Sequence, residues 1–480
     1  MAPIIDFLNN IFWGYVLIYG LLAVGVFFTL RLGFLQIRHF PEFFRVVIGS
    51  GESDKAGITP LQALTVSLAS RVGTGNLAGV AVALTLGGPG AIFWMWMVAL
   101  FGMATAYAES TLAQLYKIRN EDGDYRGGPA FYMARGLRAP WMGGVFSVCL
   151  ILSFGLIFNA VQANSIADAT EAAFGISKLW VGIGVAAITA IVIFGGIRSI
   201  ARVAEIVVPF MAVIYLLVAL YVVAVHITEV PGVLALIVKS AFGLEEAAGG
   251  VAGGVAAAML NGVKRGLFSN EAGMGSAPNI AAVATPDPHH PSSQGMVQAL
   301  GVFIDTLLIC TATAIMILLS GALTVGGTVT GTELTQNALS NHIGGAGTYF
   351  IAIAIFFFAF TSIIGNYSYS ENALTFLKLA NKPGLIVMRL AVLAMVIWGA
   401  TVKVQTVFDF ADASMGLMAT VNLIAILLLS GTVVKLTRDY FRQRAAGRNP
   451  IFDNDEYPEL KGKIDGTIWT KHGPMQTPAE

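Results

Sequence analysis

The sequence is poor in charged residues. Of its 480 residues, 12% are charged and 56% are hydrophobic, whereas an ordinary soluble domain carries roughly twice that charged share. The net charge is zero, which argues against nucleic acid as a partner because binding phosphate requires a concentrated basic surface. The composition therefore indicates a membrane protein with much of its chain in the lipid bilayer.

Cysteine is scarce as well. The two cysteines, Cys149 and Cys310, each lie within an apolar run, where cysteine behaves as a small hydrophobic residue. Neither a disulfide framework nor a metal cluster is indicated. His289 and His290 lie between prolines, which favours a solvated loop over a metal site.

Motifs of intramembrane enzymes are missing. The spans hold no His-Glu-x-x-His, no Gly-x-Ser-x-Gly and no cluster of cysteine and histidine. The glycine-containing run at 182–187 lies inside an apolar span with no strand before it, which argues against a nucleotide loop. We therefore expect that the protein is not an enzyme.

Long hydrophobic runs dominate what is present. A window of about 19 residues predicts an all-α polytopic protein with eleven transmembrane helices. Most of them exceed the ~20 residues that cross a bilayer. The predicted spans are 12–30, 60–86, 89–115, 142–170, 179–195, 203–226, 251–285, 294–320, 347–377, 384–400 and 404–431.

The positive charges predict an orientation. With 31–59 taken as cytoplasmic, 22 Lys and Arg residues fall on the cytoplasmic side and three, Lys178, Lys239 and Lys403, on the other. Basic residues concentrate on the cytoplasmic side of membrane proteins. The N-terminus is therefore expected outside and the C-terminus inside.

The order of spans suggests one extra helix followed by two groups of five. Five spans in each group force the groups to face opposite ways, as in an inverted repeat. We expect an N-terminal helix and linker at 1–59, a first repeat at 60–226, a second at 251–431 and a cytoplasmic tail at 432–480.

Two spans carry polar and glycine residues in their middle. These interruptions lie at Ser70–Asn76 and Lys264–Ser276. The first begins ten residues after Pro60, and the first glycine of the second, Gly266, lies fifteen residues after Val251. A helix can break at membrane depth only where protein or ligand satisfies the freed backbone groups. Two breaks at one depth predict a binding site near the midplane, although glycines can also form a surface for close helix packing.

Broken helix ends suit a zwitterion and a cation. The free N–H groups attract a carboxylate, and the free C=O groups attract an ammonium group or a sodium ion. Gly73 and Gly75 allow the backbone to approach such a ligand without a side chain between them. The pattern favours a secondary transporter; a passive channel and an intramembrane enzyme are the rival classes.

Four runs resemble the bacterial alanine or glycine:cation (sodium:alanine) symporter family: 71–81 (RVGTGNLAGVA), 87–96 (GGPGAIFWMW), 126–130 (RGGPA) and 268–279 (FSNEAGMGSAPN). The resemblance covers about residues 12 to 460. It implies sodium-coupled import of alanine or glycine across the bacterial cytoplasmic (inner) membrane by alternating access. It also implies the leucine-transporter type of 5+5 inverted-repeat fold.

The resemblance also implies residue roles. A co-transported sodium ion is expected on the carbonyl oxygens of Ala69 and Val72 and the hydroxyls of Thr361 and Ser362. The substrate site is expected to comprise Gly73, Thr74, Gly75, Asn76, Gln162, Phe268, Ser269 and Asn270, with the N–H groups of Thr74 and Gly75 holding the carboxylate. Gln162 is expected on the pocket wall, where its alternative role is packing near the outer interface.

Ionisable residues inside spans leave the coupling ion open. They are costly in lipid and should face each other, water or backbone; they include Arg71, Glu109, Lys264, Arg265, Glu271 and Asp305. We expect ion pairs across the broken helices. The alternatives are that Arg71 binds the substrate carboxylate, or that Asp305 or Glu271 changes protonation and couples transport to protons.

Overall fold

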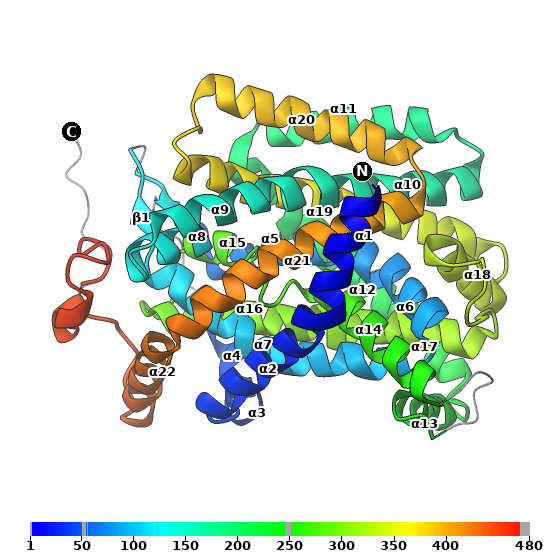
Figure 1. The fold of residues 1–480 in the computed structure, drawn as a ribbon, viewed down its shortest axis with the longest axis horizontal. Coiled ribbons are helices and arrows are strands. Elements are labelled where there is room, and N and C mark those ends of the chain that lie inside the picture. Colours follow the sequence, from blue (N-terminus) through cyan, green and yellow to red (C-terminus); the bar gives the residue numbers. More distant parts are fainter. Residues whose placement is uncertain (1, 50–53, 55, 122, 245–250, 471–480) are drawn as a thin grey trace.

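The computed structural model describes residues 2–49, 54, 56–121, 123–244 and 251–470 (Figure 1). These residues form helices and one antiparallel pair of short strands, β1 (Ile118–Arg119) and β2 (Tyr125–Arg126). The all-helical class is thereby confirmed. Within the described residues, eight helices are long and apolar enough to span a membrane: Pro3–Arg31, Gly90–Leu115, Pro140–Phe174, Gly196–Val225, Pro291–Ser320, Ala346–Phe376, Lys382–Thr401 and Val404–Leu428.

Three of these eight spans comprise several helical segments: α1 (Ala2–Ile11), η1 (Phe12–Val16) and α2 (Leu17–Arg31); α9 (Pro140–Leu150), η4 (Ile151–Ile157) and α10 (Phe158–Phe174); and α16 (Pro291–Val302), η5 (Phe303–Cys310) and α17 (Thr311–Ser320). The other five are single helices: α7 (Gly90–Leu115), α12 (Gly196–Val225), α19 (Ala346–Phe376), α20 (Lys382–Thr401) and α21 (Val404–Leu428). Shorter helices connect or cap them: α3 (Leu35–Arg38), α4 (Phe40–Ile48), α8 (Pro129–Phe131), η3 (Tyr132–Gly136), α13 (Val230–Ala241), α18 (Gly331–Ile343), α22 (Ser430–Ala445), η6 (Asn454–Glu456) and η7 (Pro458–Leu460).

The three remaining predicted spans are shorter or interrupted. Span 179–195 is α11 (Lys178–Ile193), with 16 residues. Span 60–86 is divided into α5 (Pro60–Arg71), η2 (Gly75–Gly79) and α6 (Val80–Gly87), and span 251–285 into α14 (Val251–Asn270) and α15 (Pro278–Val283). The count of eleven transmembrane helices therefore stays a prediction.

The first break lies where the sequence placed it. Thr59 and Gln62 form a capping box that starts α5, and the helix ends at Arg71. Val72 is extended, with φ −78° and ψ 92°, and helical structure resumes at Thr74. A cap at one end and a glycine at the other thus define a half-helix that stops inside the protein.

The second break lies later than predicted. Helix α14 continues through Lys264, Arg265 and Gly266 to Asn270, and the irregular segment covers 271–277. Lys264 and Arg265 leave the helix intact because Asp412 on α21 neutralises both, at 3.2 and 2.5 Å. The chain turns instead where Gly273 and Gly275 have φ of +90° and +81°, a conformation that glycine adopts without strain.

The two breaks lie side by side in the interior. A Cβ atom on Gly75 would lie 3.1 Å from the Cα of Ser269. Helix α19 runs alongside the first break, where a Cβ on Gly365 would lie 3.1 Å from the backbone nitrogen of Ser70. Close approach at both glycines brings three elements from distant parts of the sequence together.

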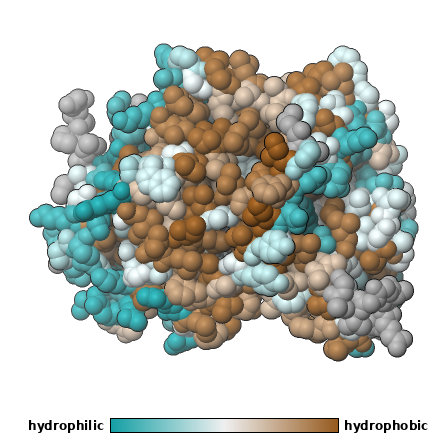
Figure 2. All heavy atoms as spheres, in the orientation of Figure 1, coloured by the Kyte–Doolittle hydropathy of each residue, from teal (hydrophilic) through white to brown (hydrophobic). Residues whose placement is uncertain are grey.

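The surface is arranged as expected for a membrane protein. Apolar side chains cover the middle of the face in Figure 2, and hydrophilic ones gather at its left end, over α22 and the strands, and over α18 at its right. Helix α12 turns large apolar side chains outward, with Ile206 at 68% and Phe210 at 64% exposed. Such a face suits lipid.

The described part of the C-terminal tail packs against the body of the protein. Trp469 is fully buried, and its Nε1 donates to the carbonyl oxygen of Leu115 at 3.1 Å. The backbone N–H of Phe452 donates to the carbonyl oxygen of His289 at 2.9 Å. Residues 452–469 therefore form an ordered cover over the α15–α16 loop and the end of α7.

This packing overturns the expectation of solvated histidines. His290 is fully buried, with its Nε2 3.3 Å from Asp439 Oδ2, and burial lowers its pKa although Asp439 opposes the shift. Burial and the nearby Lys117 ammonium lower the pKa of His289 to about 4. Both imidazoles are thus neutral near pH 7.

Candidate functional site

The free amides of the first break are occupied by side-chain oxygens. The N–H of Gly73 donates to Asn76 Oδ1 at 2.9 Å, and the N–H of Thr74 donates to Gln162 Oε1 at 3.0 Å. All four residues are buried. The amide of Gln162, which α10 supplies, therefore lies where a carboxylate oxygen would bind at the end of a half-helix.

Gly73 is closely surrounded by side-chain oxygens of two other helices. A Cβ atom there would overlap Ser362 Oγ and lie 2.7 Å from Gln162 Oε1, whereas ordinary contacts begin at 3.4 Å. Helices α10 and α19 thus converge on one backbone position. This close approach is the physical reason for glycine at the break.

The expected sodium ligands are partly brought together. Ser362 Oγ donates to the carbonyl oxygen of Ala69 at 2.8 Å, which joins α19 to the last turn of α5. Thr361 is also buried, and its Oγ1 donates to Phe358 O at 2.9 Å within its own helix. The described contacts join Ser362 to Ala69; for Thr361 and Val72 they show no bond across the break.

The residues expected at the second break occupy the last turn of α14. Phe268 and Ser269 lie against Gly75, and Phe268 stacks on Phe158 with ring centroids 4.8 Å apart. Asn270 points elsewhere, because its Oδ1 accepts from the N–H of Ala272 at 3.0 Å and its Nδ2 has no partner in the described chain. Phe268 and Ser269 therefore join the first break, and Asn270 does not.

A polar cluster around Asp305 extends the expected site. Asn76 Nδ2 donates to Asp305 Oδ1 at 2.6 Å, and Ser269 Oγ and Thr306 Oγ1 donate to Asp305 Oδ2 at 2.8 and 2.6 Å. Cys310 Sγ lies 3.1 Å from Ser269 Oγ. The sequence marks Asp305 as a costly intramembrane charge, but nothing local in the sequence links it to Asn76.

A second cluster ties the two breaks together. Ser70 Oγ donates to Glu271 Oε1 at 2.8 Å and lies 2.6 Å from Asn366 Oδ1. Glu271 Oε2 accepts from Ser276 Oγ at 2.5 Å. Asn366 Nδ2 in turn donates to Asn159 Oδ1 at 3.1 Å on α10.

The irregular segment of the second break has its own anchor. Glu109 on α7 accepts from the N–H of Gly273 at 3.2 Å and from Asn422 Nδ2 at 2.7 Å. Asn422 also donates to the carbonyl oxygen of Gly273 at 2.9 Å, and Tyr132 donates to its Oδ1. These bonds satisfy backbone groups that unwinding would otherwise leave unpaired.

The expected ion pair at Arg71 is not formed. Arg71 is buried, its Nη1 donates to the carbonyl oxygen of Gln298 at 3.1 Å, and its Nε and Nη2 have no partner in the described chain. Glu271 is held by hydroxyl groups instead. Among the intramembrane charges named above, the described residues form ion pairs at Lys264 and Arg265, both with Asp412.

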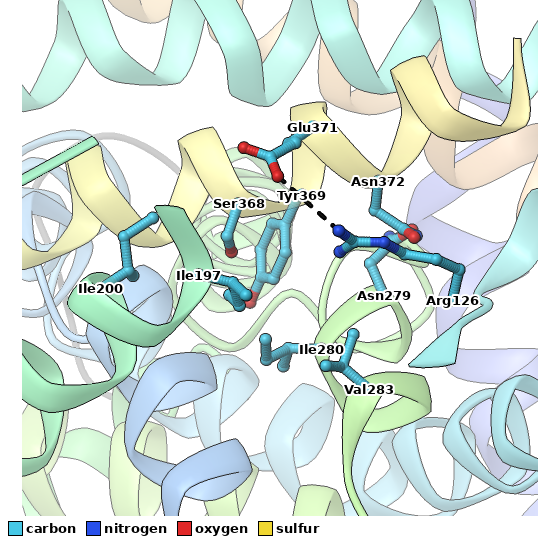
Figure 3. Close-up of a pocket in the computed structure, with 10 residues that line it drawn as sticks. All are labelled: Arg126, Ile197, Ile200, Asn279, Ile280, Val283, Ser368, Tyr369, Glu371 and Asn372. Carbon is cyan, nitrogen blue, oxygen red and sulfur yellow. Dashed lines mark hydrogen bonds and ion pairs between the residues drawn. The ribbon is translucent and has the colours of Figure 1, made fainter. Parts of the chain in front are cut away.

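A small cavity lies between this site and the end of α15 (Figure 3). Its volume is about 10 Å³, room for a single water molecule. Arg126 Nη2 lies 3.8 Å from Glu371 Oε1, and Asn372 Nδ2 donates to Asn279 Oδ1 at 2.7 Å. These contacts join β2 and α15 to α19 beside the cavity. The cavity is lined by Arg126, Ile197, Ile200, Asn279, Ile280, Val283, Ser368, Tyr369, Glu371 and Asn372.

Comparison with known proteins identifies the family. Residues 1–454 match the model of the sodium:alanine symporter family. The chain belongs to this family. The resemblance carried by the four sequence runs is thereby confirmed.

Relatives of this symporter are similar along nearly their whole length. The amino-acid carrier protein AlsT of Bacillus subtilis is 50% identical over 458 residues, which cover 95% of this chain and 96% of the relative. The probable sodium/glutamine symporter GlnT of the same organism is 50% identical, with coverage of 95% and 94%. The sodium/proton-dependent alanine carrier protein of Bacillus sp. strain PS3 is 40% identical, with coverage of 86% and 94%.

Family membership fixes the broad function. The protein is an integral membrane transporter of the amino-acid:cation symporter class and not an enzyme. Co-transport of a cation with an amino acid follows from membership.

Proposed function

We propose that this symporter imports alanine or glycine together with sodium. Substrate binding displaces the Gln162 amide from the N–H of Thr74, and the substrate carboxylate takes its place. The contact that supports this assignment is the 3.0 Å hydrogen bond between Thr74 N and Gln162 Oε1. An oxygen acceptor already occupies the half-helix end, where a carboxylate binds more strongly because it carries a full negative charge.

Sodium is proposed to bind between α5 and α19. Its ligands are the carbonyl oxygens of Ala69 and Val72 and the hydroxyls of Thr361 and Ser362. The bond from Ser362 to Ala69 O supports this site, because a hydroxyl and a carbonyl within 2.8 Å can both turn their oxygens to a hard cation. Sodium bound there would hold the end of α5 in place for the substrate.

A small side chain fits the walls of the proposed substrate site. Phe268 Cδ1 lies 3.1 Å from the position of a Cβ on Gly75, and Phe158 backs Phe268. Gly73, Gly75, Asn76 and Ser269 complete the site. Asn270 is proposed to join it only after the second break rearranges, since its side chain faces away here.

The architecture proposed for this function comprises eleven transmembrane helices. An N-terminal helix and linker (1–59) precede two inverted repeats of the leucine-transporter type (60–226 and 251–431), and a cytoplasmic tail follows (432–480). The N-terminus lies outside and the C-terminus inside the cytoplasmic (inner) membrane. The two broken spans support this arrangement because each opens its group of five and the two breaks lie against each other.

Uptake into proteoliposomes tests the proposed function. We expect labelled alanine or glycine to accumulate above its equilibrium level only when sodium is higher outside, and glutamine serves as the comparison substrate because one relative is named for it. Uptake that stops at equilibrium would indicate a channel. Accumulation that follows a pH gradient without sodium would assign the coupling ion as a proton, as one relative's name suggests.

The Gln162 step is tested by two variants. Gln162→Ala should lower the alanine concentration for half-maximal uptake, because no acceptor then has to be displaced from the N–H of Thr74. Gln162→Glu should raise it, because a carboxylate competes with the substrate for the same N–H group. Equal, unchanged affinities in both variants would contradict the assignment.

A further inference from the structure

A pocket of about 250 Å³ opens between the end of α2 and helix α22, which lies beside α3 and α4 in Figure 1. Arg31 and Leu32 line one wall of this α2–α22 pocket, and Arg438 and Phe441 line the other. His39 also lines it and stacks on Phe441, with ring centroids 3.8 Å apart. Both arginines are exposed, and the space is far larger than a single water molecule needs.

The α2–α22 pocket carries positive charge without a compensating acid. The two segments that form it, 31–45 and 430–445, contain seven Lys or Arg residues and two acidic residues, Glu42 and Asp439. Both acidic side chains are buried and already paired with other arginines, at 2.7 and 2.5 Å. Among the described residues that line the pocket there is no acidic side chain. The charges of the two lining arginines are therefore uncompensated inside it.

The donors of the pocket suit a phosphate group. A guanidinium group offers several N–H donors in a planar arrangement that matches phosphate oxygens, and here two such groups lie on facing walls. Partial burial and the Arg38 guanidinium lower the pKa of His39, although Glu42 opposes the shift. Its ring is thus neutral near pH 7 and keeps one N–H donor.

The pocket also lies where two spans leave the membrane. The span Pro3–Arg31 ends at one of its lining arginines, and α22 begins two residues after the span Val404–Leu428. Leu30 and Phe34, next to the lining residues in the sequence, are both exposed. Apolar side chains exposed at this level suit the acyl chains of a lipid, and basic pockets at the cytoplasmic ends of membrane helices suit anionic headgroups.

We propose that the α2–α22 pocket binds the headgroup of an anionic phospholipid, with its phosphate between Arg31 and Arg438 and its acyl chains beside Leu30 and Phe34. A zwitterionic lipid fits less well, because its cationic group would meet two arginines and no free carboxylate. In the proposed orientation the lipid belongs to the cytoplasmic leaflet. It joins α22 to α2 and so stabilises the helix from which the C-terminal cover at 452–469 extends.

A second pocket with two arginines serves as an internal comparison. It has a volume of about 570 Å³ and is lined by Arg198 and Arg202, so it has the space and the donors for a headgroup as well. However, Asp54 and Glu205 line the same pocket and balance the two positive charges. We therefore expect it to show no preference for an anionic lipid.

Lipid binding to the full-length protein in detergent tests the proposal. Native mass spectrometry should show one phosphatidylglycerol bound more tightly than phosphatidylcholine with the same acyl chains. Arg31→Gln and Arg438→Gln should each weaken this binding about fivefold, and the double variant roughly 25-fold, since one basic residue near an anionic surface contributes about 1 kcal/mol. Arg202→Gln is the matched control and should bind like the wild type. Wild-type affinity in the double variant, or an equal loss in Arg202→Gln, would overturn the proposal.

Two further measurements distinguish a lipid from a soluble anion and test the effect on α22. Inorganic phosphate at millimolar concentration should leave the binding of phosphatidylglycerol unchanged, and displacement of the lipid by phosphate would replace the proposal with a site for a soluble anion. In nanodiscs, exchanging phosphatidylcholine for phosphatidylglycerol should increase the protection of α22 from hydrogen exchange in the wild type and not in Arg31→Gln, Arg438→Gln. Equal gains in both proteins would contradict the role of the two arginines.

Discussion

Replacing Gly73 with alanine tests the central geometry of the site most directly. The added methyl group would overlap Ser362 Oγ and lie 2.7 Å from Gln162 Oε1, so Gln162 must retreat by about 0.7 Å to reach the ordinary 3.4 Å contact and Ser362 by more. Overpacking of this kind costs about 1–3 kcal/mol. Since every 1.4 kcal/mol is tenfold in an equilibrium constant, binding should weaken roughly 5- to 150-fold.

The same displacement breaks two contacts that serve different ligands. Ser362 loses the carbonyl oxygen of Ala69, which belongs to the proposed sodium site. Gln162 leaves the N–H of Thr74, and the added methyl group crowds the position that the substrate carboxylate is proposed to take. We therefore expect Gly73→Ala to raise the half-maximal concentrations of sodium and of alanine together. Initial rates of alanine uptake into proteoliposomes, titrated with each ligand in turn, measure both.

Two further variants test whether the clash at Gly73 causes the weaker binding of sodium and alanine. Gly79→Ala adds the same methyl group six residues beyond, where the nearest atom lies at an ordinary 3.7 Å, and should behave as the wild type. Removing the hydroxyl in Gly73→Ala, Ser362→Ala should restore part of the alanine affinity but none of the sodium affinity. If Gly73→Ala titrates like the wild type, or if the double variant recovers nothing, the reasoning is wrong.

Three other outcomes are expected. Thr361→Ala should raise the sodium requirement roughly 5- to 30-fold, because losing one hydrogen-bonding hydroxyl costs about 1–2 kcal/mol, and it should leave the ratio of alanine to glycine uptake unchanged. Equal loss of affinity for sodium and substrate would count against the ion site. Glu371→Gln removes the 3.8 Å ion pair that joins α19 to Arg126 on β2, whose side chains are largely buried. We expect this loosening to speed alanine counterflow, and a slower exchange would contradict the expectation that the pair resists the transport movement. His289 has a folded-state pKa of about 4, below its unfolded value, so docking of the tail at 452–469 should be complete above about pH 6.5 and weaken as the pH falls toward 4. Hydrogen exchange of residues 452–469, corrected for the intrinsic rate, should show that protection falls with pH in the wild type and not in His289→Gln. Identical pH profiles in the two proteins would contradict the role of His289.

The C-terminal tail illustrates a limit of sequence reasoning. Its basic and mixed composition is that of a solvated segment, and no periodic apolar face marks residues 452–469. Trp469 nonetheless reaches a carbonyl oxygen 354 residues earlier in the chain. A few isolated aromatic residues suffice for docking when a complementary surface exists, and that surface is formed by other segments.

The sequence alone determined the membrane-protein class, the approximate spans and the position of the first break. Apolar runs longer than the bilayer core define the spans, the distribution of lysine and arginine predicts which loops stay inside, and glycine at 73 predicts the first break. Each of these depends on the solvation or the backbone freedom of neighbouring residues, so it can be derived from the sequence. The motifs around Gly73 and Gly275 also sufficed to indicate the family.

Only the tertiary structure decided where the second break lies and which side chains from distant segments meet at the site. It moved the second break from Lys264 to Glu271, because Asp412, more than 140 residues away in the sequence, neutralises the charges that looked disruptive. It placed the Gln162 oxygen on the N–H of Thr74 and joined Asp305 to Asn76. Hydrogen bonds between segments so far apart depend on how helices pack and rotate against one another, and no local pattern encodes that rotation.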